Sequence, residues 1–280
     1  MLLFNAPLHT LRKRKFFQSL LKSRWNRPKL YNLGFSHRVA LRPLTHASIR
    51  LRKQHLEPGI RVLITSLVQK LDEHKDEGWF FDVGANVGLY VWEVAKVCPT
   101  RKILAFEPDP ANFQLLEMTQ KGADILNLEL CPDALSNQTD EVSFSQDPLT
   151  SATGCIKGEE KPWIEQYLNG STNQITVNTR TMDSEVDDNK IPSLIKIDVE
   201  GHEVEVLQGA LHTLSNTKPL LIIESFPPKQ AKVISLLQAY GYNLVDADRN
   251  SPVNSKTNNL FAWHPQGPLK ESIIQKVLHK

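Results

Sequence analysis

The sequence predicts an α/β fold in which a mostly parallel sheet of seven strands carries helices on both faces. Three observations support this prediction. From Trp79 onward, short apolar segments alternate with amphipathic segments of helical length, which is typical of a parallel sheet covered by helices. A turn bracketed by two glycines directly follows the first apolar segment. An acidic residue ends the second one, at the edge where open α/β sheets bind ligands.

This alternation gives a definite order of elements. Strands are expected at residues 79–84, 102–107, 126–132, 194–199, 220–225, 242–247 and 259–264. Helices are expected at residues 59–75, 88–97, 110–121, 202–215 and 228–240.

A long insertion separates the third and fourth of these strands. It contains two further extended segments, 141–145 and 174–180, which we expect to pair with each other at a sheet edge. Between them lies a loop, residues 147–161, that is rich in Ser, Thr and Gly. A loop of this length inside a compact domain is usually functional or disordered.

The composition is that of an ordinary soluble globular chain. Its 280 residues suffice for one large domain and an extension, and 40% of them are apolar and 23% charged. Cys98, Cys131 and Cys155 have neither paired nor metal-binding spacing, which fits buried thiols in a reducing compartment. The sequence has neither a secretory signal nor an apolar run of the roughly 18 residues that a membrane span needs, so we expect a cytoplasmic protein.

The charge is distributed unevenly. Residues 1–56 hold 13 Lys or Arg and no acid, whereas the rest of the chain has an excess of acids. We therefore divide the chain into a basic N-terminal extension or lid, 1–56, and a main domain, 57–280. Within the extension, residues 8–25 are expected to form a basic helix with an apolar stripe, and residues 35–53 a short hairpin or lid.

The basic helix at 8–25 is compatible with several roles. It could hold the protein on an anionic membrane surface as a peripheral anchor, meet an acidic partner or serve as an organellar address. It could equally pack its apolar stripe on its own domain and leave a solvated basic face.

The segment Trp79–Pro110 carries the first candidate site. Gly84 and Gly88 bracket a five-residue turn that lets the backbone bend sharply and approach a ligand, because neither glycine has a Cβ. The next helix points its amide end at the turn. Asp82 lies near the end of the first strand, and Glu107 at the tip of the second is placed to accept hydrogen bonds from both hydroxyls of a ribose. The segment therefore predicts a nucleoside pocket.

Residues missing from the turn narrow the choice of nucleoside. A dinucleotide fingerprint starting at Gly84 needs glycines where the chain has Asn86 and Leu89, so a pyrophosphate fits poorly. The spacing Asp82-x-Gly84-x-x-x-Gly88 resembles instead the pattern of class I S-adenosylmethionine-dependent methyltransferases, which have a Rossmann-like sheet. Alternatively, the glycines only make a tight turn, although the acid at the second strand tip is independent of them.

Four ionisable side chains gather within seven residues at the fourth main strand. Lys196 lies inside this strand, where a charge is costly unless a carboxylate meets it. Asp198, Glu200 and His202 follow at the carboxyl edge of the sheet, where ligands bind. The alternative is structural: an acid caps the next helix and Lys196 belongs to a satisfied core ion pair.

Three blocks in order, Phe81–Tyr90, Ala105–Pro108 and Ile195–Glu203, resemble the FkbM family of S-adenosylmethionine-dependent methyltransferases. The resemblance is strong over residues 79–226 and concerns only the architecture in the last 50 residues. It implies that the chain binds S-adenosylmethionine. The residues that would hold this cofactor are Asp82, Gly84, Ala85, Asn86, Gly88, Glu107, Asp133 and Ala134.

The resemblance further implies an O-methyltransferase that acts on a hydroxyl of a sugar, glycolipid or secondary-metabolite acceptor. An alcohol is a weak nucleophile, so a base near the methyl group helps. The candidate catalytic residues are Lys196, Asp198, Glu200 and His202. Histidine has the ordinary pKa best suited to a base at neutral pH, whereas a divalent ion held by Asp198 and Glu200 would acidify the hydroxyl instead.

A competing interpretation is a non-catalytic cofactor-binding domain that its basic N-terminus recruits to an anionic membrane or partner. The complete cluster from Asp198 to His202 argues against it. A nucleic-acid substrate is a weaker rival, because the basic segment suits phosphates but the Asn/Asp-Pro-Pro-Tyr/Phe motif of amino-methylating enzymes is absent. We therefore expect a small-molecule or glycan acceptor and no nucleic acid.

Overall fold

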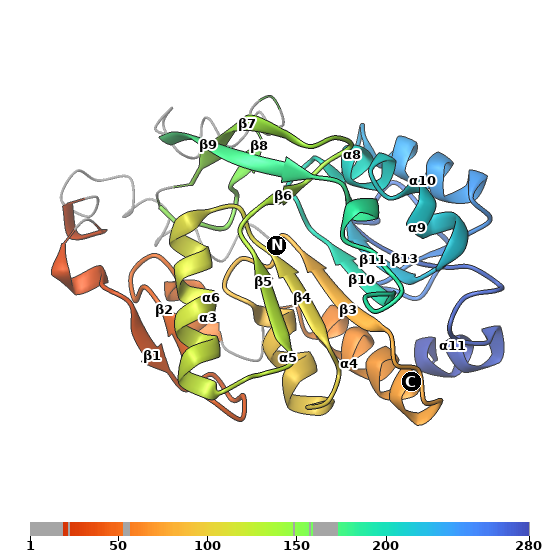
Figure 1. Ribbon diagram of the computed structural model, residues 1–280, viewed down its shortest axis with the longest axis horizontal. Coiled ribbons are helices and arrows are strands. Elements are labelled where there is room, and N and C mark those ends of the chain that lie inside the picture. The colour runs from red at the N-terminus through yellow and green to blue at the C-terminus, as the bar shows by residue number, and fades with distance from the viewer. Residues whose placement is uncertain are drawn as a thin grey trace.

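The protein is described here by a computed structural model that covers residues 19–21, 23–52, 57–147, 149–156, 158 and 173–279. Seven strands form its central sheet: β3 (Trp79–Val83), β4 (Ile103–Phe106), β5 (Leu128–Cys131), β10 (Pro192–Ile197), β11 (Leu220–Glu224), β12 (Asn243–Asp246) and β13 (Asn259–Trp263). They lie in the order β12–β13–β11–β10–β3–β4–β5 (Figure 1). All seven expected strands are confirmed, each to within two residues.

The strand order creates a switch point between β3 and β10. The chain runs outward from β3 to β4 and β5, then returns to place β10 on the other side of β3. These strands are parallel, and Ile197 of β10 lies in register with Val83 of β3 and Ile223 of β11. The residues that follow these three therefore emerge side by side at the carboxyl edge of the sheet. Strand β13 runs antiparallel to both of its neighbours.

Two hydrophobic clusters, one on each face, hold the helices to the sheet. One face carries α4 (Pro58–Glu73), α5 (Leu89–Val97), α6 (Pro110–Ala123) and α11 (Glu271–Leu278). The other face carries α8 (Glu203–Gln208), α9 (Leu211–Asn216) and α10 (Gln230–Ala239). Helix α11 is not among the expected helices.

The helix expected at 202–215 is two helices, α8 and α9, because the chain breaks at Gly209. The carbonyl oxygen of Gly209 accepts the backbone N–H of Asp183 at 2.9 Å. A Cβ at residue 209 would lie 2.0 Å from the carbonyl oxygen of Ser136. The break therefore lets two segments of the insertion approach the helix backbone.

The insertion after β5 builds a sheet of its own. Its strands are β6 (Ala134–Leu135), β7 (Asp140–Gln146), β8 (Cys155–Ile156) and β9 (Asn173–Arg180), in the order β6–β9–β7–β8 (Figure 1). The expected pairing of the two extended segments is confirmed as the antiparallel pair β7–β9. They do not extend an edge of the main sheet, because β9 pairs on its other side with β6, which follows β5 directly.

The described part of the N-terminal extension packs into the main domain. Strands β1 (Lys29–Tyr31) and β2 (Val39–Leu41) form an antiparallel hairpin, which lies earlier than the expected 35–53, and α3 (Ala47–Arg52) follows it. All of β2 is buried in the cluster that also contains α4 and α6. Apolar β2 side chains complete this core, so the hairpin is more than a mobile lid.

The basic helix expected at 8–25 falls largely outside the described residues. Within it, residues 19–21 are helical, and η2 (Arg24–Asn26) is a short 3-10 helix. Asn26 is buried and fastens this segment, because its side chain donates to Thr45 Oγ1 at 2.8 Å and accepts the N–H of Leu44 at 2.9 Å.

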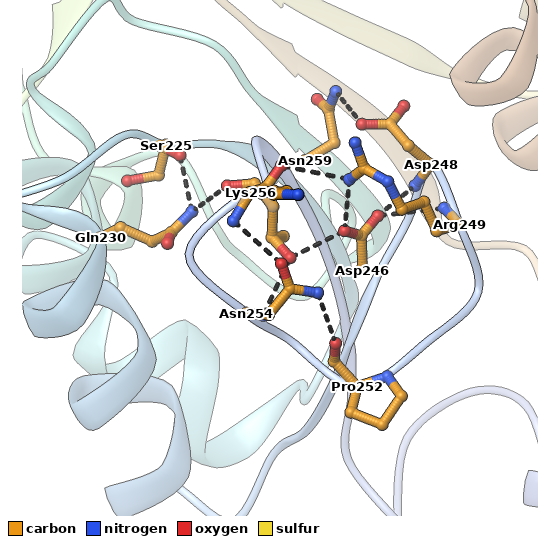
Figure 2. Close-up of polar contacts among 10 residues, drawn as sticks. Ser225, Gln230, Asp246, Asp248, Arg249, Pro252, Asn254, Lys256 and Asn259 are labelled. Carbon is orange, nitrogen blue, oxygen red and sulfur yellow. Dashed lines mark hydrogen bonds and ion pairs between the residues drawn. The ribbon is translucent and has the colours of Figure 1, made fainter.

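The connection between β12 and β13 is ordered by a buried carboxylate (Figure 2). Asp246 accepts hydrogen bonds from Thr257 Oγ1 at 2.7 Å and from Arg249 Nη1 at 2.8 Å. Gln230 of α10 donates to the carbonyl oxygens of Ser225 and Thr257 at 2.8 and 2.7 Å. These bonds fasten the loop to the residue that follows β11.

The three cysteines are buried, as expected, and none of them forms a disulfide within the described residues. Among the helices that the structure describes, none combines the length and the apolar character needed to cross a membrane.

A substitution of Gly84 tests the close contact at the switch point. In Gly84→Ala, the new Cβ would lie 1.9 Å from the carbonyl oxygen of Asp198, at a φ of +84°. We expect a loss of at least ~2 kcal/mol in the free energy of unfolding, measured with denaturant, because both the overlap and the backbone conformation are unfavourable. The control is Gly59→Ala in α4, where nothing lies within 4 Å of the new Cβ. It should be neutral or slightly stabilising. Equal stabilities of the two variants would contradict this account.

Candidate functional site

A pocket opens at the carboxyl edge of the main sheet, beside the switch point between β3 and β10. The first motif contributes Gly84, Asn86 and Glu107, and the second contributes Asp198, Glu200 and His202. The structure therefore brings together two motifs that are more than 90 residues apart in the chain.

The glycine turn serves the pocket mainly through its backbone. Gly84 lies against the carbonyl of Asp198, and the N–H of Asp198 donates to Val83 at 2.9 Å. Gly88 begins α5 at a φ of +84°, and a Cβ there would overlap Trp92. Gly88 and the buried Ala85 do not line the pocket, so their contribution is to shape the turn.

Glu107 is held rigidly by backbone donors on both carboxylate oxygens. Oε2 accepts the N–H of Asn86 at 2.6 Å, and Oε1 accepts the N–H of Asp109 at 2.9 Å. Burial, followed by the nearby charge of Asp109, raises the pKa of Glu107 to about 8. The carboxylate is thus fixed in direction and has little solvation of its own.

Part of the insertion closes the pocket above Glu107. The carbonyl oxygen of Ser151 accepts hydrogen bonds from Asn86 Nδ2 at 2.7 Å and from Asn112 Nδ2 at 3.1 Å. Asp147 orders this loop, because its carboxylate accepts the N–H groups of Leu149 and Thr150 at 2.9 and 3.0 Å. The length of the loop indicated that it is functional or disordered, but the sequence did not identify these contacts.

Two buried acceptors next to Glu107 lack partners. Within the described part of the chain, neither Asn86 Oδ1 nor Asn112 Oδ1 has a hydrogen-bond partner. Both residues line the pocket. Asn86 also has a positive φ of 53°, which is uncommon outside glycine and is found often at functional sites. A ligand with hydrogen-bond donors would satisfy these oxygens.

Lys196 lies beneath the second motif and is almost completely buried. Its Nζ is 3.4 Å from Asp198 Oδ2 and 5.5 Å from the centre of the Tyr90 ring. Burial by itself lowers the pKa of Lys196. The surrounding carboxylates, Asp198 first, raise this pKa by a larger amount, so the net shift is upward. Lys196 therefore stays charged and supports Asp198 from below, which its sequence position suggested.

His202 lines the pocket, but its contacts tie it to the insertion. Its Nε2 lies 2.9 Å from Ser136 Oγ, and its Nδ1 lies 3.6 Å from Glu205 Oε2. These contacts make a link between α8 and the segment after β6. Because of these contacts, Asp198 is better placed than His202 to contact a molecule bound in the pocket.

Two other sequence candidates lie outside the pocket lining. Asp133 pairs with Arg180, which also binds Glu185, whereas the neighbouring Ala134 does line the pocket. Asp82 is 1% exposed and accepts the N–H of Val91 in the first turn of α5. It therefore supports the helix behind the turn.

Glu224 is a further acid at this edge to which the sequence assigned no role. Its side chain is hydrogen-bonded to that of Asp198 on the neighbouring strand. Its position near the end of the strand expected at 220–225 was the available signal. Among the described residues, no group of three or more His, Cys, Asp or Glu side chains has the geometry of a metal site.

The chain is similar in sequence to known methyltransferases. Residues 82–244, more than half of the chain, match the family model of the Methyltransferase FkbM domain. Hexuronic acid methyltransferase AglP of Haloferax volcanii is 28% identical over 155 residues, which are 54% of this chain and 58% of AglP. Methyltransferase 1 of Beauveria bassiana is 25% identical over 146 residues, which are 48% of this chain and 59% of that protein.

A crystal structure of methyltransferase FkbM from Methylobacillus flagellatus KT is also similar. The superposition covers 67% of this chain and 44% of the Methylobacillus chain, with a TM-score of 0.48 and 19% sequence identity. The chain therefore spans less than two thirds of the length of each of these three proteins.

The buried carboxyls of the site make stability depend on pH. Burial raises the pKa of Asp82 to about 7 and that of Glu107 to about 8. Both values exceed the ordinary ones of the unfolded chain, so the stability from these groups is full below about pH 4, falls as pH rises from there, and is lost once pH has passed 7 to 8. We expect the melting temperature to fall between pH 5 and 8, and Glu107→Gln to flatten this slope. The exposed Glu141→Gln is the control. A melting temperature that rises over this interval would contradict the assignment.

Proposed function

The chain belongs to the FkbM methyltransferase family, and on that premise we propose that it transfers a methyl group from S-adenosylmethionine to a hydroxyl oxygen. The acceptor would be a sugar, a glycolipid or a secondary metabolite. The observation that carries the proposal is the single pocket in which the Gly84 turn, Glu107 and Asp198 meet.

The residues present fit this cofactor. Glu107 offers two oriented oxygens to the ribose hydroxyls, and the unpartnered oxygens of Asn86 and Asn112 offer acceptors beside it. The pocket is also lined by apolar side chains that suit an adenine ring, among them Phe106 and Ile156. A sulfonium cation is favoured by the carboxylates at the edge of β10.

The cofactor supplies a methyl group that its sulfonium already activates. The protein must therefore align the acceptor and exclude water. The Ser151 loop covers the pocket on one side, and Asp198 stands at its edge beside Gly84. Asp198 is the best-placed base of the four candidates, Lys196 holds it in position, and Glu200 and His202 complete the rim.

The acceptor class rests on a relative and on the chemistry of the site. One relative is a hexuronic acid methyltransferase, so a sugar acceptor is our first choice. Carboxylates such as Asp198 and Glu200 accept hydrogen bonds from hydroxyls, and a base at this edge suits an alcohol better than a more nucleophilic amine.

Removal of the Glu107 carboxylate tests the cofactor. We expect Glu107→Ala to weaken S-adenosylmethionine binding at least about tenfold, equivalent to ~1.4 kcal/mol, because the ribose hydroxyls lose the hydrogen-bond partners that Glu107 offers. Isothermal titration calorimetry measures the affinity, with the exposed Glu141→Ala as control and circular dichroism to confirm folding. Unchanged affinity in folded Glu107→Ala would remove Glu107 from the cofactor site.

Turnover tests the reaction. The protein is incubated with S-adenosylmethionine and a panel of sugars, glycolipids, small alcohols, amines and RNA, and S-adenosylhomocysteine is measured. We expect turnover with a hydroxyl acceptor, and Asp198→Asn should lower kcat roughly 10²–10⁴-fold, the usual contribution of a general base. His202→Ala should cost less, because His202 is bonded to Ser136. Transfer to an amine alone would overturn the acceptor class, and loss of turnover with a chelator would favour a divalent ion.

A second candidate is a non-catalytic cofactor-binding protein held on an anionic membrane. One observation favours membrane contact: Trp25 is 64% exposed near the end of the basic segment, and the Arg24 guanidinium lies 6.0 Å from its ring centre. Aromatic and basic side chains together suit an anionic interface. Sedimentation with phosphatidylserine vesicles, compared between wild type and Trp25→Ala, tests this surface. Vesicle binding without turnover on any acceptor would favour this second candidate.

A further inference from the structure

Asp198 and Glu224 are neighbours because of strand register. Ile197 of β10 pairs with Ile223 of β11, so the next residue of each strand emerges at the same level of the sheet edge. The two side chains are hydrogen-bonded to each other. Two carboxyl groups so close form a pair that holds a shared proton near neutral pH, because two adjacent negative charges repel each other.

The pair stands in a dense field of charged groups on the α4 and α5 face of the sheet. The Nζ of Lys196 lies 3.4 Å from Asp198 Oδ2. Asp82 on β3 is the register partner of Lys196. Glu57 at the start of α4 accepts a hydrogen bond from the Tyr90 hydroxyl. The charges of Glu200, Glu203, Asp248 and Arg61 also act on members of this cluster.

The proton of the pair resides on Glu224. The charge of Asp198, followed by burial, raises the pKa of Glu224 to about 10. Lys196 is cationic and contacts Asp198, which favours the ionised form of that residue. Glu224 therefore donates its proton to a carboxylate oxygen of Asp198 and fixes the orientation of the Asp198 carboxylate.

We propose that Asp198 and Glu224 work as a pair in which Asp198 takes the proton of the acceptor hydroxyl and Glu224 is the residue that positions it. This inference rests on the function proposed above and adds Glu224 to the machinery. The pocket lining supports it, because Asp198 borders the pocket whereas Glu224 stands behind it on the next strand.

The charge balance of the reaction explains why a carboxylate suffices. The acceptor oxygen forms a bond to the methyl carbon while the carbon–sulfur bond breaks, and the bonding electron pair stays on sulfur. The positive charge thus moves to the acceptor oxygen, which becomes strongly acidic, and its proton passes to Asp198. A weak base can accept such a proton. The Asp198–Glu224 pair, which is negatively charged, also stabilises the positive charge that develops on the acceptor oxygen.

The far side of the pair is also held in place. Glu224 lies in register with Asn259 of β13, and Asn259 Nδ2 donates to Asp248 Oδ2 at 3.0 Å (Figure 2). The same loop is fastened by the buried Asp246. Glu224 therefore stands between two ordered strands, which suits a positioning residue better than a mobile surface acid does.

Three cofactor analogues test the pair without knowledge of the acceptor. Sinefungin carries a protonated amine at the position of the transferable methyl, S-adenosylhomocysteine has no group there, and methylthioadenosine lacks the amino-acid end. We expect the full-length wild type to bind sinefungin about tenfold more tightly than S-adenosylhomocysteine at pH 7, measured by calorimetry, because the ionised pair attracts the amine.

Variants assign this preference to the pair. Asp198→Asn should abolish it, because the negative charge is gone. Glu224→Val should reduce it at least threefold, because Asp198 loses its donor. Glu224→Gln should keep it, because its amide donates a hydrogen bond as the protonated carboxyl does. Because Gln also has the size of Glu, Glu224→Met separates hydrogen bonding from packing: its side chain is of similar length but has no donor. It should reduce the preference as Glu224→Val does, whereas a packing role alone would let it keep the preference. The control is the exposed Glu141→Gln.

The outcomes separate this inference from the proposed function. Failure of the wild type to bind any of the three analogues would overturn the proposed function. Binding with a sinefungin preference that survives in folded Asp198→Asn would overturn the inference alone. A change in Glu224→Val confined to the ratio of S-adenosylhomocysteine to methylthioadenosine affinity would place the pair at the amino-acid end and would also overturn it. Should Glu224→Val not fold, Glu224→Met takes its place, because it also lacks the hydrogen-bond donor.

Discussion

The site depends on the close approach of the two chain segments that leave β3 and β10. The N–H of Asp198 donates to the carbonyl of Val83 at 2.9 Å, which continues the sheet ladder past the last paired residues. A side chain at residue 84 has no room, since its Cβ would lie 1.9 Å from the Asp198 carbonyl oxygen. This contact sets the position of both motifs, because the glycine turn leads to Glu107 and the β10 exit leads to the Asp198–Glu224 pair.

The second constraint is the concentration of buried charge around this contact. Lys196 is the cation that the described structure places among Asp82, Asp198 and Glu224. Burial raises the pKa of Asp82, and the charge of Asp198 together with burial raises the pKa of Glu224. Such an arrangement costs stability unless a cation or shared protons offset it. Structural networks also gather charges, but this one borders a pocket whose asparagine oxygens lack partners within the described residues. The electrostatics therefore favour a cationic ligand with hydrogen-bond donors.

Segments outside the two motifs complete the domain. The β1–β2 hairpin fills the core between α4 and α6 with apolar side chains from β2. The insertion folds into its own sheet, and its Ser151 carbonyl bridges Asn86 and Asn112 over the pocket. The loop after β12 is held by Asp246 and borders Glu224 through Asn259. The hairpin joins the core, and the other two segments border the site, through contacts between residues that are far apart in the chain.

The sequence by itself determined the seven main strands, the switch-point turn and the acids at the strand tips, because period, glycine spacing and strand-end position are local properties. It could not determine which way each acid faces. Asp133 pairs with Arg180, His202 contacts Ser136, and Glu224 meets Asp198, and each partner comes from a distant part of the chain. The break at Gly209 and helix α11 were missed for the same reason. Such contacts depend on strand register and on how the insertion folds back, so only the tertiary structure decided them.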